Sequence, residues 1–122
     1  MYIISRFLFF SNQIKLYHWI TNSFARHTSS DKLFASINEH MDKFIETYIG
    51  RYGRKHVFNN LSKYDTIKLK LYSDNDVIEL IGDLIKFLEK DIPGEINDTD
   101  LLNIRDDLLG DVNQVKYLFT LK

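Results

Sequence analysis

Cysteine is absent from this chain of 122 residues, so disulfide bonds, thiolate metal ligands and cysteine nucleophiles are all excluded. A strong net charge is also missing, because 16 basic and 17 acidic residues leave a formal charge of -1. Lysine and arginine are spread along the sequence rather than gathered in one stretch. The chain therefore lacks the electrostatic footprint of a nucleic-acid binder, and we do not expect a nucleic acid as its partner.

We expect neither a targeting signal nor a membrane span in this sequence. The apolar stretch from Met1 to Phe10 is interrupted by Ser5 and Arg6 and is too short to cross a bilayer. It has neither the basic start nor the small-residue cleavage site of a signal peptide. We expect a soluble, cytoplasmic protein that does not associate with membranes, and a virion or host-cell location stays open.

The composition is that of an ordinary folded domain. Hydrophobic residues make up 44% and charged residues 27% of the chain, which sets disorder aside. The length suits one core and is too short for two. We expect a single domain over residues 1–122.

Apolar residues recur at helical intervals in four stretches. They predict a helix over about residues 2–24, a second that begins close to His27 and ends near Gly50, a third from 74 or 76 to the Pro93-Gly94 pair, and a fourth from 97–100 almost to the last residue. Residues 66–72 alternate between apolar and polar types and predict an extended segment. The order predicts an all-α, up-and-down four-helix bundle with a long connection between the second and third helices.

Four potential metal ligands lie on the second of these stretches. His27, Asp31, Asp42 and Glu46 fall within about 100° of one helical face at about 100° per residue. His27 and Asp42 are about 22 Å apart along such a helix, at about 1.5 Å per residue. One chain cannot bring both to one ion, so a shared site requires a second subunit.

Each residue also has a purely structural explanation. Asp31 can be a charge matched to the helix dipole, while Asp42 and Glu46 can be solvated residues paired with Lys43 and Arg51. Taken together they favour metal binding, because Asp42 and Glu46 are one turn apart and can grip one hard cation. His18 and His27 can add nitrogen ligands, and mixed oxygen and nitrogen ligation suits iron or manganese better than a closed zinc site.

The pair His18-Trp19, followed by His27, Asp31, Asp42 and Glu46, resembles the motif of the miniferritins, the Dps-like branch of the ferritin-like superfamily. The resemblance covers roughly residues 10–50. The ferritin signature Glu-x-x-His, which builds a site inside one bundle, is absent from the sequence. This absence favours a site between subunits.

The resemblance implies a ferritin-like bundle with a ferroxidase centre at a two-fold interface. It implies that His18, His27 and Asp31 come from one subunit and Asp42 and Glu46 from the other. Trp19 would lie near the centre without being a ligand. The expected activity is oxidation of Fe(II) by peroxide or dioxygen, with iron stored as a ferric mineral and with manganese or zinc as substitute metals. The expected partner is a second copy of the chain at least, and a dodecameric cage at most.

Two other function classes stay open. A ferritin-like scaffold without iron chemistry could serve as an interaction module of a larger assembly, which the surplus of aromatic residues near the N-terminus supports. A nucleic-acid binder would depend on the small basic cluster from Arg51 to His56, and the near-neutral charge argues against it.

Overall fold

Helices make up the ordered elements of the chain. The computed structural model describes residues 2–58 and 68–121, and within these ranges there is no β-strand. None of the helices described combines the length and the hydrophobicity needed to cross a membrane. The predicted all-α class is confirmed, with the elements α1 (Tyr2–Ile20), α2 (Phe24–Tyr52), α3 (Arg54–Phe58), α4 (Val77–Lys86), the π-helix η2 (Phe87–Asp91), α5 (Ile92–Glu95) and α6 (Thr99–Leu118).

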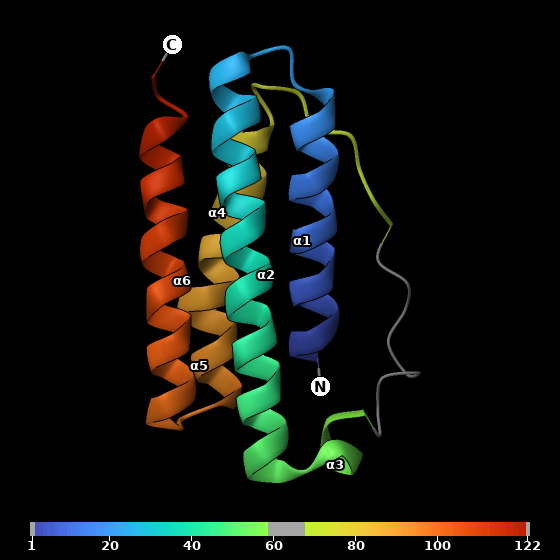
Figure 1. The fold of residues 1–122 in the computed structure, drawn as a ribbon, viewed down its shortest axis with the longest axis vertical. Helices are drawn as coiled ribbons and strands as arrows, with labels where there is room; N and C mark the ends of the chain where they lie inside the picture. Colours follow the sequence, from blue (N-terminus) through green and yellow to red (C-terminus); the bar gives the residue numbers. More distant parts are fainter. Residues whose placement is uncertain (1, 59–67, 122) are drawn as a thin grey trace.

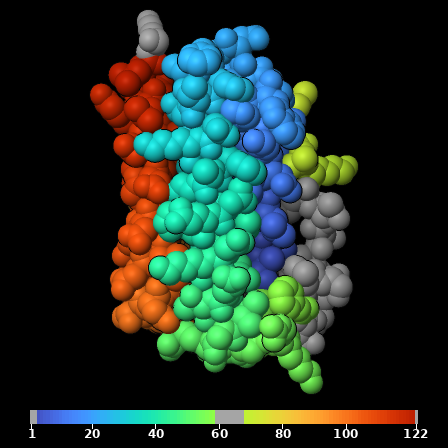
Figure 2. Space-filling model, in the orientation of Figure 1, coloured from blue at the N-terminus to red at the C-terminus, as the bar shows by residue number. Residues whose placement is uncertain are grey.

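The long helices lie side by side along one axis (Figure 1). α2 packs against α1 on one side and α6 on the other, and it forms the middle of the broad face in Figure 2. α2 ends at the end of the bundle opposite to the one where α4 begins, as the predicted long connection requires (Figure 1). This arrangement does not by itself establish a ferritin-like topology.

Local capping explains where α2 begins and ends. The predicted first helix stops at Ile20 rather than near residue 24, because Ser23 caps the next helix by accepting a hydrogen bond from the backbone N–H of Arg26 at 3.2 Å. α2 was predicted to end near Gly50 but continues to Tyr52. Gly53 ends it with φ of +85°, a left-handed conformation that glycine adopts without strain.

The third predicted helix does not stop at Pro93. α4 passes through the π-helical turn of η2 into α5, which ends at Glu95. Pro93 lies in the first turn of α5, directly after the π-helical turn in which the Ile92 N–H donates to the Phe87 oxygen. Because proline has no N–H, the helical bonding is interrupted at this position while the helix continues. A π-helical turn is rare and depends on tertiary packing, so the sequence pattern did not reveal it.

Aromatic side chains fill the centre of the bundle. The ring centroid of Phe7 lies 5.4 Å from that of Phe44 and 5.2 Å from that of Phe87, which joins α1, α2 and η2. Phe10 contacts Phe87 at 5.6 Å, and all four rings are fully buried. Such pairs add specific geometry to the burial of a large apolar area.

A buried amide holds the connecting segment against α1. Gln13 is fully buried, and its Nε2 donates to the backbone oxygen of Lys70 at 2.8 Å while its Oε1 accepts from the Lys70 N–H at 2.6 Å. Of the predicted extended segment, residues 66 and 67 lie outside the described residues, and residues 68–73 form neither helix nor strand. Gln13 thus supplies the hydrogen bonds that a neighbouring strand would otherwise provide.

Replacing Phe7 by alanine is expected to lower the free energy of unfolding by about 3–5 kcal/mol, since it removes a fully buried ring from the aromatic centre. Urea denaturation followed by circular dichroism measures the change. Leu8→Ala is the matched control, because Leu8 on the same helix is 47% exposed and its truncation should cost no more than about 0.5 kcal/mol. Equal losses for the two variants would contradict this account of the core.

Candidate functional site

Two histidines close the hairpin between α1 and α2. Nδ1 of His18 lies 2.7 Å from the backbone oxygen of His27, and Nδ1 of His27 lies 2.9 Å from the backbone oxygen of His18. A carbonyl oxygen only accepts, so Nδ1 carries the hydrogen in both rings. The rings stack with centroids 3.9 Å apart and planes 17° apart. This reciprocal pairing ties the last turn of α1 to the first turn of α2.

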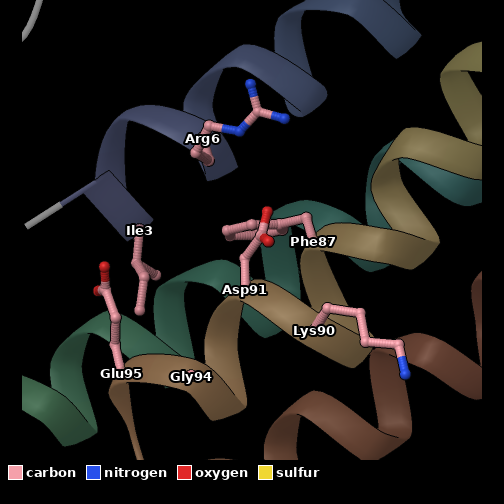
Figure 3. A pocket seen from close by; sticks show the side chains of 7 residues that line it. All are labelled: Ile3, Arg6, Phe87, Lys90, Asp91, Gly94 and Glu95. Atoms are coloured by element: carbon pink, nitrogen blue, oxygen red, sulfur yellow. The ribbon is translucent and has the colours of Figure 1, made fainter.

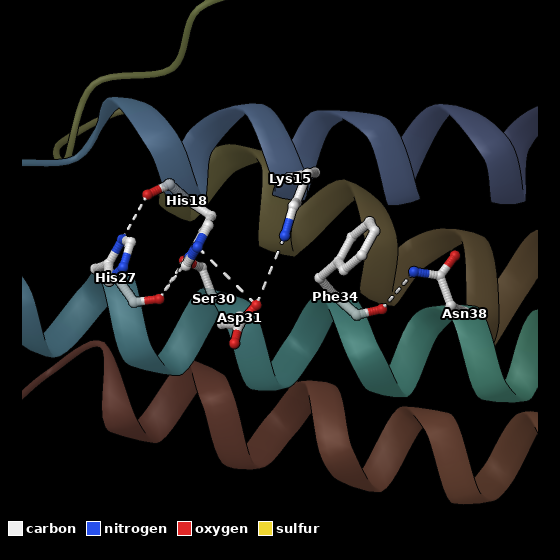
Figure 4. A network of polar contacts seen from close by, with 7 residues as sticks. All are labelled: Lys15, His18, His27, Ser30, Asp31, Phe34 and Asn38. Atoms are coloured by element: carbon white, nitrogen blue, oxygen red, sulfur yellow. Dashed lines mark hydrogen bonds and ion pairs between the residues drawn. The ribbon is translucent and has the colours of Figure 1, made fainter.

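A polar network continues from the histidine pair along the α1–α2 seam (Figure 4). The Ser30 hydroxyl donates to the backbone oxygen of His27 at 3.2 Å. Oδ1 of Asp31 lies 4.0 Å from Nε2 of His18 and 3.8 Å from Nζ of Lys15. Lys15 also lies over the ring of Phe34 at 4.6 Å, so it joins the network to an aromatic surface.

The other two predicted ligands lie far from this network. Asp42 and Glu46 are exposed and lie on α2 with His27 and Asp31, as the predicted continuous helix requires. Asp42 is eleven residues beyond Asp31, or about 16 Å along the helix at about 1.5 Å per residue. The structure brings His18, His27 and Asp31 together and leaves Asp42 and Glu46 apart.

Within the described part of one chain, the predicted ligands are not grouped around a common point. Among the described residues, no group of three His, Cys, Asp or Glu side chains is arranged to hold one. The stacking of His18 on His27 gives a reason, because the in-plane lone pairs of parallel rings run parallel and cannot both point at one ion. A site shared between two chains is not tested by a single chain and stays a prediction.

Three residue types of a hydrolase triad also meet between α2 and α6. Ser36 Oγ donates to Asp111 Oδ2 at 2.6 Å, and its oxygen lies 3.2 Å from Nδ1 of His40. That Nδ1 also lies 2.7 Å from the Ser36 backbone oxygen and therefore donates to it. The serine proton points to the carboxylate rather than to the imidazole, so His40 is not placed as a base for Ser36.

Arg26 joins three segments at the end of the bundle where α1 meets α2. Its guanidinium donates to the backbone oxygen of Asp74, before α4, and to that of Phe119, after α6, at 3.2 Å for the latter. It also donates to the Tyr17 hydroxyl at 3.4 Å and lies over the Phe119 ring at 5.0 Å. One side chain thereby positions both chain segments against the α1–α2 hairpin.

The carboxylate of Asp74 accepts two short hydrogen bonds from α1 and its end. Tyr17 Oη donates at 2.6 Å and Thr21 Oγ1 at 2.7 Å. These two bonds hold the pKa of Asp74 below its ordinary value of 3.8, because they favour the charged carboxylate. Burial, followed by the bond to Asp74, raises the pKa of Tyr17 above 10.0.

Large apolar side chains are exposed around this tightly bonded end. Trp19 is 68% and Phe24 80% exposed, and Ile20 between them is 38% exposed. We call these three residues the turn surface. The Phe24 ring centroid lies 6.4 Å from that of His27, and Lys15 lies over the Trp19 ring at 5.6 Å. The turn surface is thus apolar, exposed and mounted on a rigid hairpin.

A cleft of about 460 Å³ lies elsewhere, between α1 and the η2–α5 helix. Figure 3 shows Asp91 projecting from this helix over Phe87, with the Arg6 guanidinium turned away from it. Arg6 lies over the rings of Phe9 and Phe10, at 5.5 and 4.9 Å. The cleft has charged walls but no convergent set of groups that would define a reaction.

Sequence reasoning missed several residues that shape this end of the bundle. It passed over Arg26 and Gln13 and gave Asp74 only a role at the start of a helix, because the partners shown here lie 48 to 93 residues away along the chain. One feature of the sequence could have pointed to Gln13. It is a polar residue directly beside Ile14, which belongs to the apolar stripe of the first helix. The exposure of Trp19 had no sequence signal.

Comparison with known proteins places the chain among proteins without an assigned role. The model of a family described as "Family of unknown function (DUF5856)" matches residues 18–119. An uncharacterized 14.6 kDa protein in the mobD-ri intergenic region of Enterobacteria phage T4 is 34% identical over 107 residues, which cover 86% of this chain and 75% of that protein. No solved structure matches.

The resemblance to the miniferritins is therefore wrong. The family whose model covers residues 18–119 is DUF5856, and the relative in phage T4 is uncharacterized rather than an iron-storage protein. The apparent motif has a structural explanation in part, since His18 and His27 bond to each other's backbone and Asp31 pairs with Lys15. Spacing along a helix alone could not separate these structural roles from ligation.

Replacing His18 by phenylalanine should lower the free energy of unfolding by about 1 kcal/mol, because it keeps a ring against His27 but removes the bond to the His27 carbonyl. Urea denaturation gives the value. His56→Phe is the control, since His56 on α3 is exposed. If His18→Phe is as stable as the control, the reciprocal pairing does not hold the hairpin.

The lowered pKa of Asp74 leads us to expect that the protein loses stability in acid. A carboxyl whose folded pKa is depressed stabilises the fold fully above its unfolded pKa, near 3.8, and loses that contribution as the pH falls through the lower folded value. Asp74→Asn should therefore be less stable than the wild type at pH 7, and the gap should narrow below about pH 4. Thermal unfolding from pH 7 to pH 2.5 tests this, with the exposed Asp76→Asn as control. A gap independent of pH would contradict it.

Proposed function

The chain belongs to the DUF5856 family, and from its surface we propose that it is a helical interaction protein that pairs with a second copy of itself through the turn surface of Trp19, Ile20 and Phe24. The exposure of Trp19 and Phe24 carries the proposal. Tryptophan is among the residues that most often dominate binding energy at protein interfaces, and large apolar groups left in water favour association.

The rigidity of the hairpin supports the proposal. The reciprocal bonds between His18 and His27 and the Arg26 contacts hold the backbone on either side of the turn surface. A surface whose shape exists before binding loses less conformational entropy when it is covered. The polar network therefore serves to present the apolar residues, and no reaction step is assigned to it.

The charges beside the turn surface favour a second copy as the partner. Lys15 and Asp31 lie on the same α1–α2 face, one of each sign, so a two-fold axis could set the lysine of one copy beside the aspartate of the other. The formal charge of -1 also makes repulsion between two copies small. A surface with one sign of charge would favour a different partner.

Light scattering coupled to size-exclusion chromatography tests the pairing. The wild type should show a mass of twice 14.5 kDa, and Trp19→Ala with Phe24→Ala should shift the mass to that of one chain over the same concentrations. Loss of two such anchors is expected to weaken the pairing at least about 30-fold. Phe58→Ala, which removes a ring 44% exposed on α3, is the control and should pair as the wild type does.

The single tryptophan gives a second measurement. Trp19 is the only tryptophan, so its fluorescence reports on the turn surface alone, and the emission should shift to the blue as the protein concentration rises. A mass of one chain with emission that does not depend on concentration would overturn the proposal. A shifted mass in the Phe58→Ala control would place the interface elsewhere.

A further inference from the structure

A second hollow, of about 310 Å³, lies at the end of the bundle that is remote from the turn surface. It is formed where the last turns of α2 and the short α3 meet the segment between α5 and α6. Its lining residues are Tyr48, Tyr52, His56, Glu95, Ile96, Asn97 and Asp98.

Three aromatic rings form one wall of this hollow. The centroid of Tyr52 lies 4.7 Å from that of Tyr48 and 5.7 Å from that of His56, and Tyr48 and His56 are 5.9 Å apart. Tyr52 is 44% exposed, while Tyr48 is buried. Aromatic faces of this kind attract organic cations through their negative ring centres.

Two carboxylates, those of Glu95 and Asp98, also line the hollow. Asp98 accepts from the Tyr52 hydroxyl at 2.7 Å and from Arg51 at 2.8 Å, which explains why it does not cap α6 with its side chain. Glu95 makes no ion pair with any described residue. Because Arg51 is shared between Asp98 and Asp100, at 3.6 Å from the latter, the hollow keeps a surplus of negative charge.

The pKa of Tyr48 is affected by that charge. Its pKa is raised above 10.0, first by burial and then by the negative charges of ionised Tyr52, Glu95 and Asp98. Cations are also near, on α3, but Arg54 and Lys55 do not line the hollow. The side chains that do line it are aromatic, acidic, amide or aliphatic.

We propose that this hollow binds the guanidinium group of an arginine side chain presented by a partner protein. The guanidinium of the chain's own Arg51 already lies over the Tyr52 ring at 5.9 Å. A second planar cation can stack beside it on the aromatic wall while its N–H groups bind the carboxylate of Glu95, which combines cation–π attraction with charge-assisted hydrogen bonds. The volume is at the lower end of the range for ligand pockets, which suits one side chain rather than a large cofactor. The site lies apart from the turn surface and does not depend on self-association.

The test uses N-acetyl-arginine amide as a probe and N-acetyl-citrulline amide as its neutral counterpart of nearly the same shape. In ¹H–¹⁵N NMR spectra of the full chain at pH 8, the arginine probe should give saturable shifts confined to residues 48–56 and 95–98. The citrulline probe should leave these signals in place. Equal shifts with both probes, or shifts spread over other segments, would overturn the proposal.

Two variants separate the charge from the rings. Glu95→Gln removes the charge of an exposed carboxylate in the hollow, and Tyr52→Leu removes the exposed ring; each should weaken binding of the arginine probe at least about five-fold. Glu89→Gln, an exposed acid on η2 outside the hollow, should bind as the wild type does. Wild-type affinity in Glu95→Gln would show that the carboxylate plays no part and would contradict the assignment, and a dispersed spectrum confirms that each variant is folded.

Discussion

The end of the bundle where α1 meets α2 depends on the guanidinium of Arg26. It reaches the Tyr17 hydroxyl on α1, the backbone before α4 and the backbone after α6, and so joins three segments to α2. A planar group with five donors can satisfy several carbonyl oxygens at once, which a lysine cannot do. Of the predicted metal ligands, His18 and His27 pair at this same end of the bundle, while Asp42 and Glu46 lie farther along α2. Among the described residues, no buried side-chain nitrogen or oxygen lacks a hydrogen-bond partner.

The histidine pair illustrates how a structural contact can imitate a functional motif. His18 and His27 each direct Nδ1 to the other's backbone, and metal-binding histidines also commonly donate their second nitrogen to a carbonyl. The stacking of the two rings argues against both of them binding one ion within a chain, since rings in nearly parallel planes do not converge on one point. In this chain the pair joins the two helices of the α1–α2 hairpin. The apolar side chains of Trp19 and Phe24 beside it are exposed to solvent.

Much of the fold could be predicted because burial follows the helical period. The stripes containing Phe7, Ile14 and Leu33 are buried as expected, and α2 carries His27, Asp31 and Glu46 on one continuous helix. The failures have local causes. The π-helical turn before Pro93 depends on how that helix packs, and the bonds of Gln13 to Lys70 join residues 57 apart, beyond any periodic pattern. The sequence pointed to His18, His27 and Asp31 as polar residues of interest. It did not predict the backbone oxygens and the lysine that they contact.

The sequence by itself determined the helical class, the apolar faces of the long helices and the impossibility of gathering His27 and Asp42 at one point within a chain. These properties follow from the 3.6-residue period and the rise per residue, which are local. Only the tertiary structure decided that His18 stacks on His27, that Trp19 and Phe24 are exposed and that Tyr52 and Glu95 line the same hollow. Those facts depend on which helices pack together and at what register, and such contacts between distant residues leave no periodic trace in the chain.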